Sequence, residues 1–426
     1  MKPLDNGVQD IRALDGLRAV AALSIVVFHA LHAADFQTSP ASRTFGNYFW
    51  YLSTGVHLFF VLSGFLLFLP YARAMLRNRE LPNHWRFYRR RALRILPAYW
   101  TALAILAWLQ TTDHVHAGFT SSLITHALML HDMFPAFNRD FEGPFWTLAI
   151  EAQFYLLLPF IAAALAWFVG KSRSVGRLLG GIALLTLLAL GVRGLDIVVA
   201  DGMSKTATSG FAPTFVLATM GTQGKYLEVF FMGMFASVIY VATAEMNGLS
   251  ATVRQQLAWL VLLVSIIIIL LAVPHTIYAT PMFQPSPGWG VGALIYPMIV
   301  GVGYATLLLA IVGGSRALRW LFEAPPLRFV GLISYSLYIW HLPVILAIIP
   351  LFTGVPLLVR VVCAFGVAYL SYQLVERPFL KRRSRQDTPR STAALPEPAL
   401  VGNRSVARAA LVSADSQHAR GNTPVG

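Results

Sequence analysis

The sequence has 426 residues, of which 56% are hydrophobic and only 12% are charged, and its mean hydropathy is +0.61. Soluble domains carry roughly 25% charged residues, so this composition excludes a single water-soluble domain. The net charge of +14 does not indicate nucleic-acid binding, because the basic residues stand in short clusters between apolar runs, as in the cytoplasmic loops of membrane proteins.

The apolar runs predict an all-α polytopic membrane protein with about ten transmembrane helices, since each helix needs about 20 apolar residues. The runs cover 17–35, 50–72, 93–110, 144–169, 178–195, 225–243, 256–273, 289–313, 332–352 and 355–376. The weakly apolar stretch 119–135 is compatible with a re-entrant segment.

Strongly basic loops alternate with sparsely charged ones along this series of runs. The basic loops cover 73–94, 171–177, 316–328 and 377–385. Because cytoplasmic loops collect arginine and lysine, we expect both termini in the cytoplasm and the protein in the bacterial inner membrane, in contact with its lipids.

Three segments outside the runs complete the predicted organisation. The loop 111–143 is expected to face outward, as a place where an acceptor arrives or as an ordinary solvated loop. The polar, unpatterned residues 383–426 are expected to form a disordered cytoplasmic tail after a transmembrane domain 1–382. The acidic residues before the first run argue against a cleaved signal peptide.

The first run carries two ionisable residues, which are costly within a membrane and usually functional. Arg18 and His29 are eleven residues apart, so they share a helix face about 16 Å apart along the axis. A cation near the cytoplasm suits a phosphate or a donor carbonyl, and a deeper histidine suits a general base on a hydroxyl. The alternative is that Arg18 reaches the interface and His29 is bonded within the bundle.

Glu151 is a second candidate, in the segment 145–155. It stands about two turns from the outer end of its span, at a predicted depth similar to that of His29. A carboxylate there would orient the imidazole or stabilise its protonated form. The alternative is a structural glutamate paired with a neighbouring polar group.

Two further clusters combine charge with helical spacing. Arg90 and Arg94, four residues apart, are predicted to share a face and to hold the phosphates of a donor, although cytoplasmic orientation alone explains most arginines of this run. Ser334, Tyr338 and His341 share another helix face. His341 is either a second acid/base group or substrate ligand, or a bonded core histidine.

No metal site is predicted. Cys363 is the single cysteine, which excludes a disulfide framework or a zinc site built from cysteines within the chain. The outward histidines lack a clear helical pair with a carboxylate.

Six motifs in order resemble the membrane-bound acyltransferase-3 family, from about residue 11 to residue 382. They are Leu14–Arg18 with ten residues before His29, Gly55–Phe65, Arg89–Tyr99, Trp146–Tyr155, Ile333–His341 and Val375–Phe379. His57 departs from the family pattern, in which relatives often have an acidic residue before the double phenylalanine, so its role stays open.

The resemblance implies an O-acyltransferase with an acyl-CoA donor, by default acetyl-CoA, bound from the cytoplasm. The acceptor would be a hydroxyl of a carbohydrate or glycoside approached from outside. The implied residues are His29, Arg18 and Glu151 for catalysis, Arg90 and Arg94 for the donor, and Trp146, Tyr338 and His341 for the substrate. Some members carry a hydrolase-like domain after the membrane part, so transfer here is expected to finish within the bundle or on a separate periplasmic partner.

Two other classes share parts of this pattern. A secondary transporter also has about ten spans with ionisable residues inside the membrane, but no internal repeat relates the two halves of this sequence. A membrane sensor whose basic loops contact anionic lipid would leave Arg18, His29 and Glu151 without a role.

Overall fold

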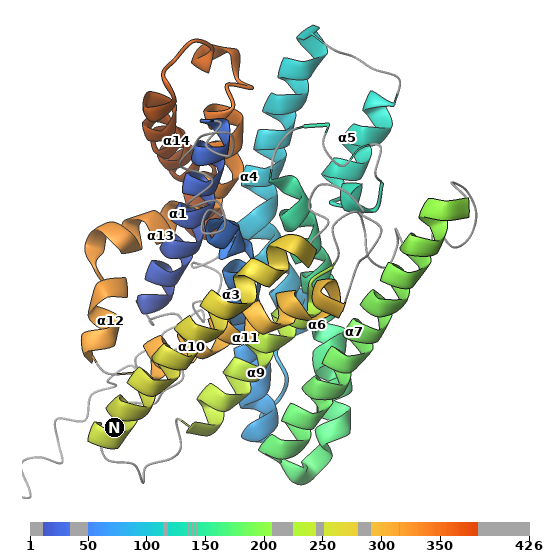
Figure 1. Cartoon of the computed structure of the whole chain (residues 1–426), viewed down its shortest axis with the longest axis vertical. Helices are drawn as coiled ribbons and strands as arrows, with labels where there is room; N and C mark the ends of the chain where they lie inside the picture. The colour runs from blue at the N-terminus through green and yellow to red at the C-terminus, as the bar shows by residue number, and fades with distance from the viewer. Residues whose placement is uncertain are drawn as a thin grey trace, which may run out of the picture. The chain divides into compact units, whose positions relative to one another are not determined.

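The computed structural model describes residues 12–34, 50–113, 118–134, 137, 140–141, 144–206, 225–243, 251–279, 291–314 and 316–381. These ranges are helical and contain no strand, which confirms the all-α prediction (Figure 1). The predicted tail and the outward residues His114 and His116 lie outside them.

The longer helices follow the predicted apolar runs. In chain order they are α1 (Ala13–Ala33), α3 (Gly55–Leu76), α4 (His84–Asp113), α6 (Phe145–Val169), α7 (Val175–Thr206), α9 (Leu227–Thr243), α10 (Ala251–Ala279), α11 (Val291–Gly313), α13 (Pro325–Ile345) and α14 (Leu357–Ser371). Short elements lie between or after them: η3 (Trp50–Thr54), α5 (Phe119–Ala127), η4 (His131–Met133), η5 (Gly170–Ser172), α12 (Arg316–Phe322), η6 (Pro350–Phe352) and the π-helical η7 (Tyr372–Glu376).

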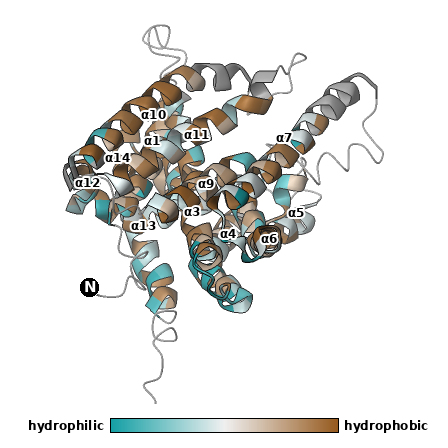
Figure 2. Cartoon of the chain, turned by 90° about the horizontal axis from the view of Figure 1, so that it is seen from below, coloured by the Kyte–Doolittle hydropathy of each residue, from teal (hydrophilic) through white to brown (hydrophobic). Residues whose placement is uncertain are grey.

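Eight of the described helices are long and apolar enough to cross a membrane: α1, α3, α4, α6, α7, α10, α11 and α14. A helix of 21 residues, such as α1, is about 31 Å long, which matches the hydrocarbon thickness. The two remaining predicted runs also form helices, α9 with 17 residues and α13 with 21. Figure 2 shows long apolar stretches in α6 and α10.

The helices differ in how much of their apolar surface they bury inside the protein. In its apolar window α3 is 67% buried, whereas α10 and α14 are only 17% buried. Because lipid tails solvate apolar side chains as well as other helices do, the exposed side chains of α10 and α14 are expected to face lipid. The helix α3 therefore belongs to the centre of the bundle, where it packs on α9, α1, α6 and α11.

The crossing of α3 and α9 depends on two glycines that face each other's backbone. A Cβ at Gly64 would lie 2.0 Å from the carbonyl oxygen of Phe230, and one at Gly233 would lie 2.1 Å from that of Val61. Small residues allow this close approach of membrane helices, which gains van der Waals contact along both backbones. The crossing fixes the position of α3, whose other residues line the functional site.

A second close contact fixes the beginning of α1. Gly331 of α13 faces the backbone of Asp15, and Gly16 faces the backbone of Phe322 in α12. The helix α13 then continues along α1, against which it packs extensively. This contact brings the charged start of α1 next to α13.

Candidate active site

Five helices, α1, α3, α4, α6 and α13, enclose a cavity of about 100 Å³. We call it the arginine cavity. Its polar lining consists of Arg18, Ser63, Arg91, Arg94, Thr147, Glu151, Tyr155, Ser334, Tyr335 and Tyr338. Its apolar lining comes mainly from α3.

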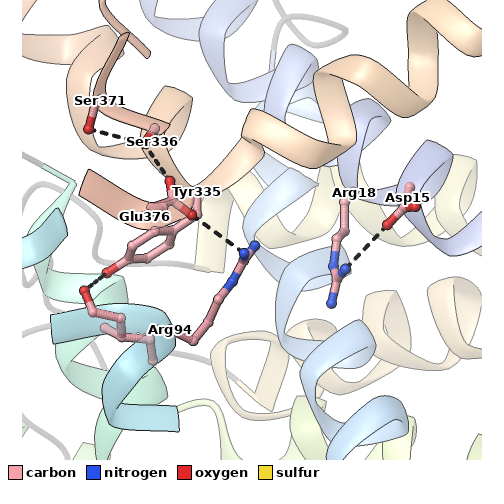
Figure 3. A network of polar contacts seen from close by, with 8 residues as sticks. Asp15, Arg18, Arg94, Tyr335, Ser336, Ser371 and Glu376 are labelled. Carbon is pink, nitrogen blue, oxygen red and sulfur yellow. Dashed lines mark hydrogen bonds and ion pairs between the residues drawn. The ribbon is translucent and has the colours of Figure 1, made fainter. Parts of the chain in front are cut away.

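Two of the arginines that line the cavity are held by carboxylates. Arg18 pairs with Asp15 at 3.5 Å, one turn away on α1, and Arg94 pairs with Glu376 at 3.4 Å (Figure 3). Glu376 is buried in η7, where it also accepts a hydrogen bond from the Ser336 hydroxyl. The π-helix therefore carries a charge that fixes the guanidinium of Arg94.

The lining carries more positive than negative charge. Arg18, Arg91 and Arg94 contribute three guanidinium groups, and Glu151 is the carboxylate among the lining residues. The Tyr335 ring lies 6.0 Å from the Arg94 guanidinium, within reach of a cation–π interaction. Such a cavity favours a ligand that brings negative charge or polarised carbonyl oxygens.

Of the two predicted donor-binding arginines, Arg94 lines the cavity and Arg90 does not. Arg91 does so instead, because residues three apart on α4 share a face as well as residues four apart do. Sequence spacing alone could not decide between the two.

Glu151 lies in the cavity and is bonded to neighbours other than His29. The hydroxyls of Ser63 and Tyr155 both donate to its Oε1. The predicted contact with His29 is not among these bonds, because an estimate of depth from the helix end ignores the rotation of α6, which turns this carboxylate toward Ser63 of α3. Ser63 is therefore the direct partner of this carboxylate from α3.

His29 belongs to a second cluster, together with His341. Nδ1 of His29 lies 3.1 Å from Nε2 of His341, and the ring centroids are 5.0 Å apart. We call these two residues the histidine pair. Arg18 and His29 share a face of α1 as predicted, but Arg18 lines the cavity and His29 is not among its lining residues.

Tyr338 connects the cavity with the histidine pair. Its ring lines the cavity and stands 5.7 Å from the ring of His341, and its hydroxyl lies 2.6 Å from Oγ1 of Thr147. Its carbonyl oxygen lies 2.8 Å from Nδ1 of His341. One residue of α13 therefore contacts both parts of the site.

Trp146 lies apart from the cavity lining, near a cluster that sequence reasoning missed. Its ring is 6.3 Å from that of Tyr226, over which the Arg193 guanidinium lies at 5.3 Å. Arg193 forms a buried ion pair with Glu228. Arg193 lies inside the apolar run 178–195, and a charged residue in that position is the signal by which the sequence could have identified it. The ring of His57 also contacts Tyr226.

Part of the segment 119–134 is packed against the bundle, although other side chains in it are exposed. The rings of His126 and His131 stack with centroids 3.9 Å apart, and both residues are buried. Burial lowers the pKa of each imidazole, because the charged form is poorly solvated there. Asp132 accepts hydrogen bonds from Lys225 at 2.6 Å and from Gln153 at 2.8 Å. These contacts attach the segment to α6 and to the start of α9.

No group of three or more potential metal ligands is present among the residues that the structure describes. The polar groups of the two clusters are instead suited to bind anions and carbonyl oxygens and to accept protons.

Comparison with known proteins gives the family of the chain. The sequence profile described as an acyltransferase domain matches residues 11–375. The "Putative peptidoglycan O-acetyltransferase YrhL" of Bacillus subtilis (strain 168) is 30% identical over 397 residues, which cover 86% of this chain and 54% of that protein. The peptidoglycan O-acetyltransferase OatA of Listeria monocytogenes is 25% identical over 391 residues, covering 87% and 56%.

The chain spans about half the length of these curated relatives. No solved structure matches it significantly. The profile match nevertheless covers nearly all of the described helices, including both clusters of the candidate site. The chain therefore belongs to this acyltransferase domain family, the membrane-bound acyltransferase-3 family that its six motifs resemble.

Proposed function

We propose that the protein is an integral-membrane O-acyltransferase that moves an acyl group from acyl-CoA to a hydroxyl of a carbohydrate. The observation that carries the proposal is the connected pair of clusters, an arginine-lined cavity joined through Tyr338 to a histidine pair. Membership of the family and the names of the relatives support the reaction class.

The arginine cavity suits the donor. Acyl-CoA carries phosphates on its nucleotide and a carbonyl on its thioester, and both attract guanidinium groups. The cavity volume of about 100 Å³ is below the roughly 300–1,000 Å³ of pockets that hold drug-sized ligands. We infer that only the narrow acyl-thioester end enters it. The nucleotide would stay at the basic cytoplasmic loops.

The histidine pair suits the acceptor. His29 takes the proton of the acceptor hydroxyl, whose oxygen forms a bond with the thioester carbonyl carbon. The carbon–sulfur bond then breaks, and the thiolate receives the proton and leaves as the thiol. Arg18 and its neighbours stabilise the negative charge that develops on the donor.

The acceptor is a carbohydrate in this proposal, because the relatives are named for acetylating peptidoglycan. Acetyl is the corresponding acyl group. Orientation by the basic loops would place the donor side in the cytoplasm and the acceptor side outside the bacterial inner membrane. Transfer would finish within the bundle or on a separate acceptor protein.

Mass spectrometry of surface glycans and small glycosides tests this function. Cells with the protein, without it and with His29→Ala would be compared. The matched control is His32→Ala, which changes an exposed histidine one turn further along α1. We expect a mass increase of one acyl group with the wild type and with His32→Ala, and none with His29→Ala.

Two results would contradict the proposal in different ways. Full acylation by His29→Ala would show that His29 is not the base, although the protein would still be an acyltransferase. No acyl difference in any fraction would favour a secondary transporter, and solute uptake that depends on the protein would then establish that class.

A further inference from the structure

His29 and His341 contact each other through Nδ1 of His29 and Nε2 of His341. The hydrogen-bond partners of the ring nitrogens indicate which nitrogen of each ring carries the proton. His29 is on α1 and His341 is on α13, two helices that pack against each other. In each residue Nδ1 turns back toward a carbonyl of its own helix, Ile25 for His29 and both Leu337 and Tyr338 for His341. Carbonyl oxygens can only accept hydrogen bonds.

The proton of His341 is therefore on Nδ1. This nitrogen lies 2.8 Å from the oxygen of Tyr338 and 3.1 Å from that of Leu337, so it must be the donor. The His341 side chain is fully buried, which strongly disfavours a second proton and a positive charge. Its Nε2 consequently carries a lone pair and accepts.

The proton of His29 follows from that of His341. Nδ1 of His29 lies 3.0 Å from the oxygen of Ile25 and 3.1 Å from Nε2 of His341. Both neighbours are acceptors, so Nδ1 of His29 carries the proton, and this N–H donates to both of them. The neutral imidazole has one N–H, which leaves Nε2 of His29 unprotonated.

We propose that His341 is a positioning residue that, together with the carbonyl of Ile25, stabilises this tautomer of His29 and holds its ring, so that Nε2 of His29 is the basic nitrogen facing the acceptor hydroxyl. The role rests on the proposed function, in which His29 is the base. It replaces the expectation that His341 is itself an acid, a base or a substrate ligand.

The arrangement also helps the proton transfer. When Nε2 of His29 takes the hydroxyl proton, the ring becomes an imidazolium, and its Nδ1–H donates a charge-assisted hydrogen bond to His341. That bond is stronger in the charged state than in the neutral one, so it favours the transition state over the ground state. His341 stays neutral throughout.

Two substitutions of His341 separate positioning from packing. In His341→Gln the amide oxygen can reach the place of Nε2 and still accept from His29, whereas His341→Leu removes the acceptor at similar volume. We expect His341→Leu to lower kcat about 10- to 100-fold, as loss of an orienting partner does, with little change in donor KM. His341→Gln should recover a large part of that loss, and His32→Leu should have no effect.

The tautomer itself can be measured without activity, by solid-state nitrogen NMR of the histidine-labelled full-length protein in lipid. Comparison with His29→Ala identifies the His29 signals. We expect a protonated Nδ1 and an unprotonated Nε2 in the wild type and in His341→Gln. In His341→Leu the carbonyl of Ile25 still accepts from Nδ1 but the second acceptor is lost, so we expect a larger share of the opposite tautomer.

The outcomes distinguish this inference from the proposed function. A wild-type His29 protonated on Nε2, or a tautomer unchanged in His341→Leu, overturns the positioning role even if His29 is essential. Normal acylation by His29→Ala overturns the base assignment even if the tautomer is as stated. Equal losses in His341→Gln and His341→Leu with an unchanged tautomer would mean that His341 only packs.

Discussion

Arg18, Arg91 and Arg94 place three guanidinium groups on the wall of one cavity, and buried or neighbouring carboxylates hold two of them. Guanidinium groups fixed in this way lose little entropy on binding, because their orientation is set before the ligand arrives. Arg94 is better fixed than Arg18, since its partner Glu376 is itself buried and bonded to Ser336.

Substitution of Arg94 tests the donor side of the site. A hydrogen bond to a charged group contributes about 1.5–3 kcal/mol, so we expect Arg94→Ala to raise the KM for acyl-CoA about 10-fold or more. The control is Trp108→Ala, which removes an exposed side chain from the other end of the same helix, away from the basic loops and the cavity lining. Steady-state kinetics in detergent or nanodiscs would measure both. An unchanged KM in Arg94→Ala would place the donor elsewhere.

Among the elements, α3 and α9 form the contact on which the site depends most. Gly64 and Gly233 let the two backbones meet, and α3 then presents Ser63 and its apolar neighbours to the cavity. A side chain at either glycine must push the helices apart, since the obstructing atoms are backbone atoms that cannot rotate away.

Gly64→Ala tests this contact. Overpacking costs about 1–3 kcal/mol, and we expect the substitution to lower the melting temperature of the purified protein. Gly180→Ala is the control, because nothing lies within 4 Å of a Cβ there and alanine favours the helix. A thermal unfolding assay followed by size-exclusion chromatography would compare them. Equal stability of the two variants would show that the helices separate at no cost.

The segment formed by α5 and η4 is expected to respond to acid. The pKa values of the stacked residues His126 and His131 are lowered in the folded protein, so the unfolded chain binds more protons below its pKa of about 6.5. Their contribution to stability is therefore present above that pH and is lost as the pH falls, by at most about 1.4 kcal/mol per histidine and pH unit.

Melting curves between pH 7.5 and pH 5 would detect this loss. We expect the melting temperature to fall with pH, and to fall less in His131→Asn, which removes one titrating group of the pair. A pH dependence identical in wild type and variant would mean that other groups cause the acid sensitivity.

For the whole molecule, the arrangement of basic loops predicts which helix ends face the cytoplasm. A membrane-impermeant maleimide can test it in the background Cys363→Ala, which removes the single native cysteine. We expect Thr120→Cys, exposed in α5, to react in intact spheroplasts, and Arg173→Cys, exposed after η5, to react only after lysis. The opposite pattern would reverse the topology and the proposed direction of transfer.

The sequence by itself determined the class of the protein and most of its helices. Apolar runs of span length have one stable solution in a bilayer, the α-helix, because every backbone polar group must be bonded within the segment. The same constraint makes ionisable residues inside a run conspicuous, so Arg18, His29, Glu151 and His341 could be selected without any structure. The order of the six motifs along the chain then indicated the family.

Only the tertiary structure decided which of these residues act together. Periodicity gives the face of a helix but not the rotation of that helix against its neighbours, so Glu151 was paired with His29 although it bonds Ser63 and Tyr155. The same limit left Arg90 and Arg91 indistinguishable. The partner of His29 lies 312 residues away, and the close packing of α1 with α13 is what brings His341 to it.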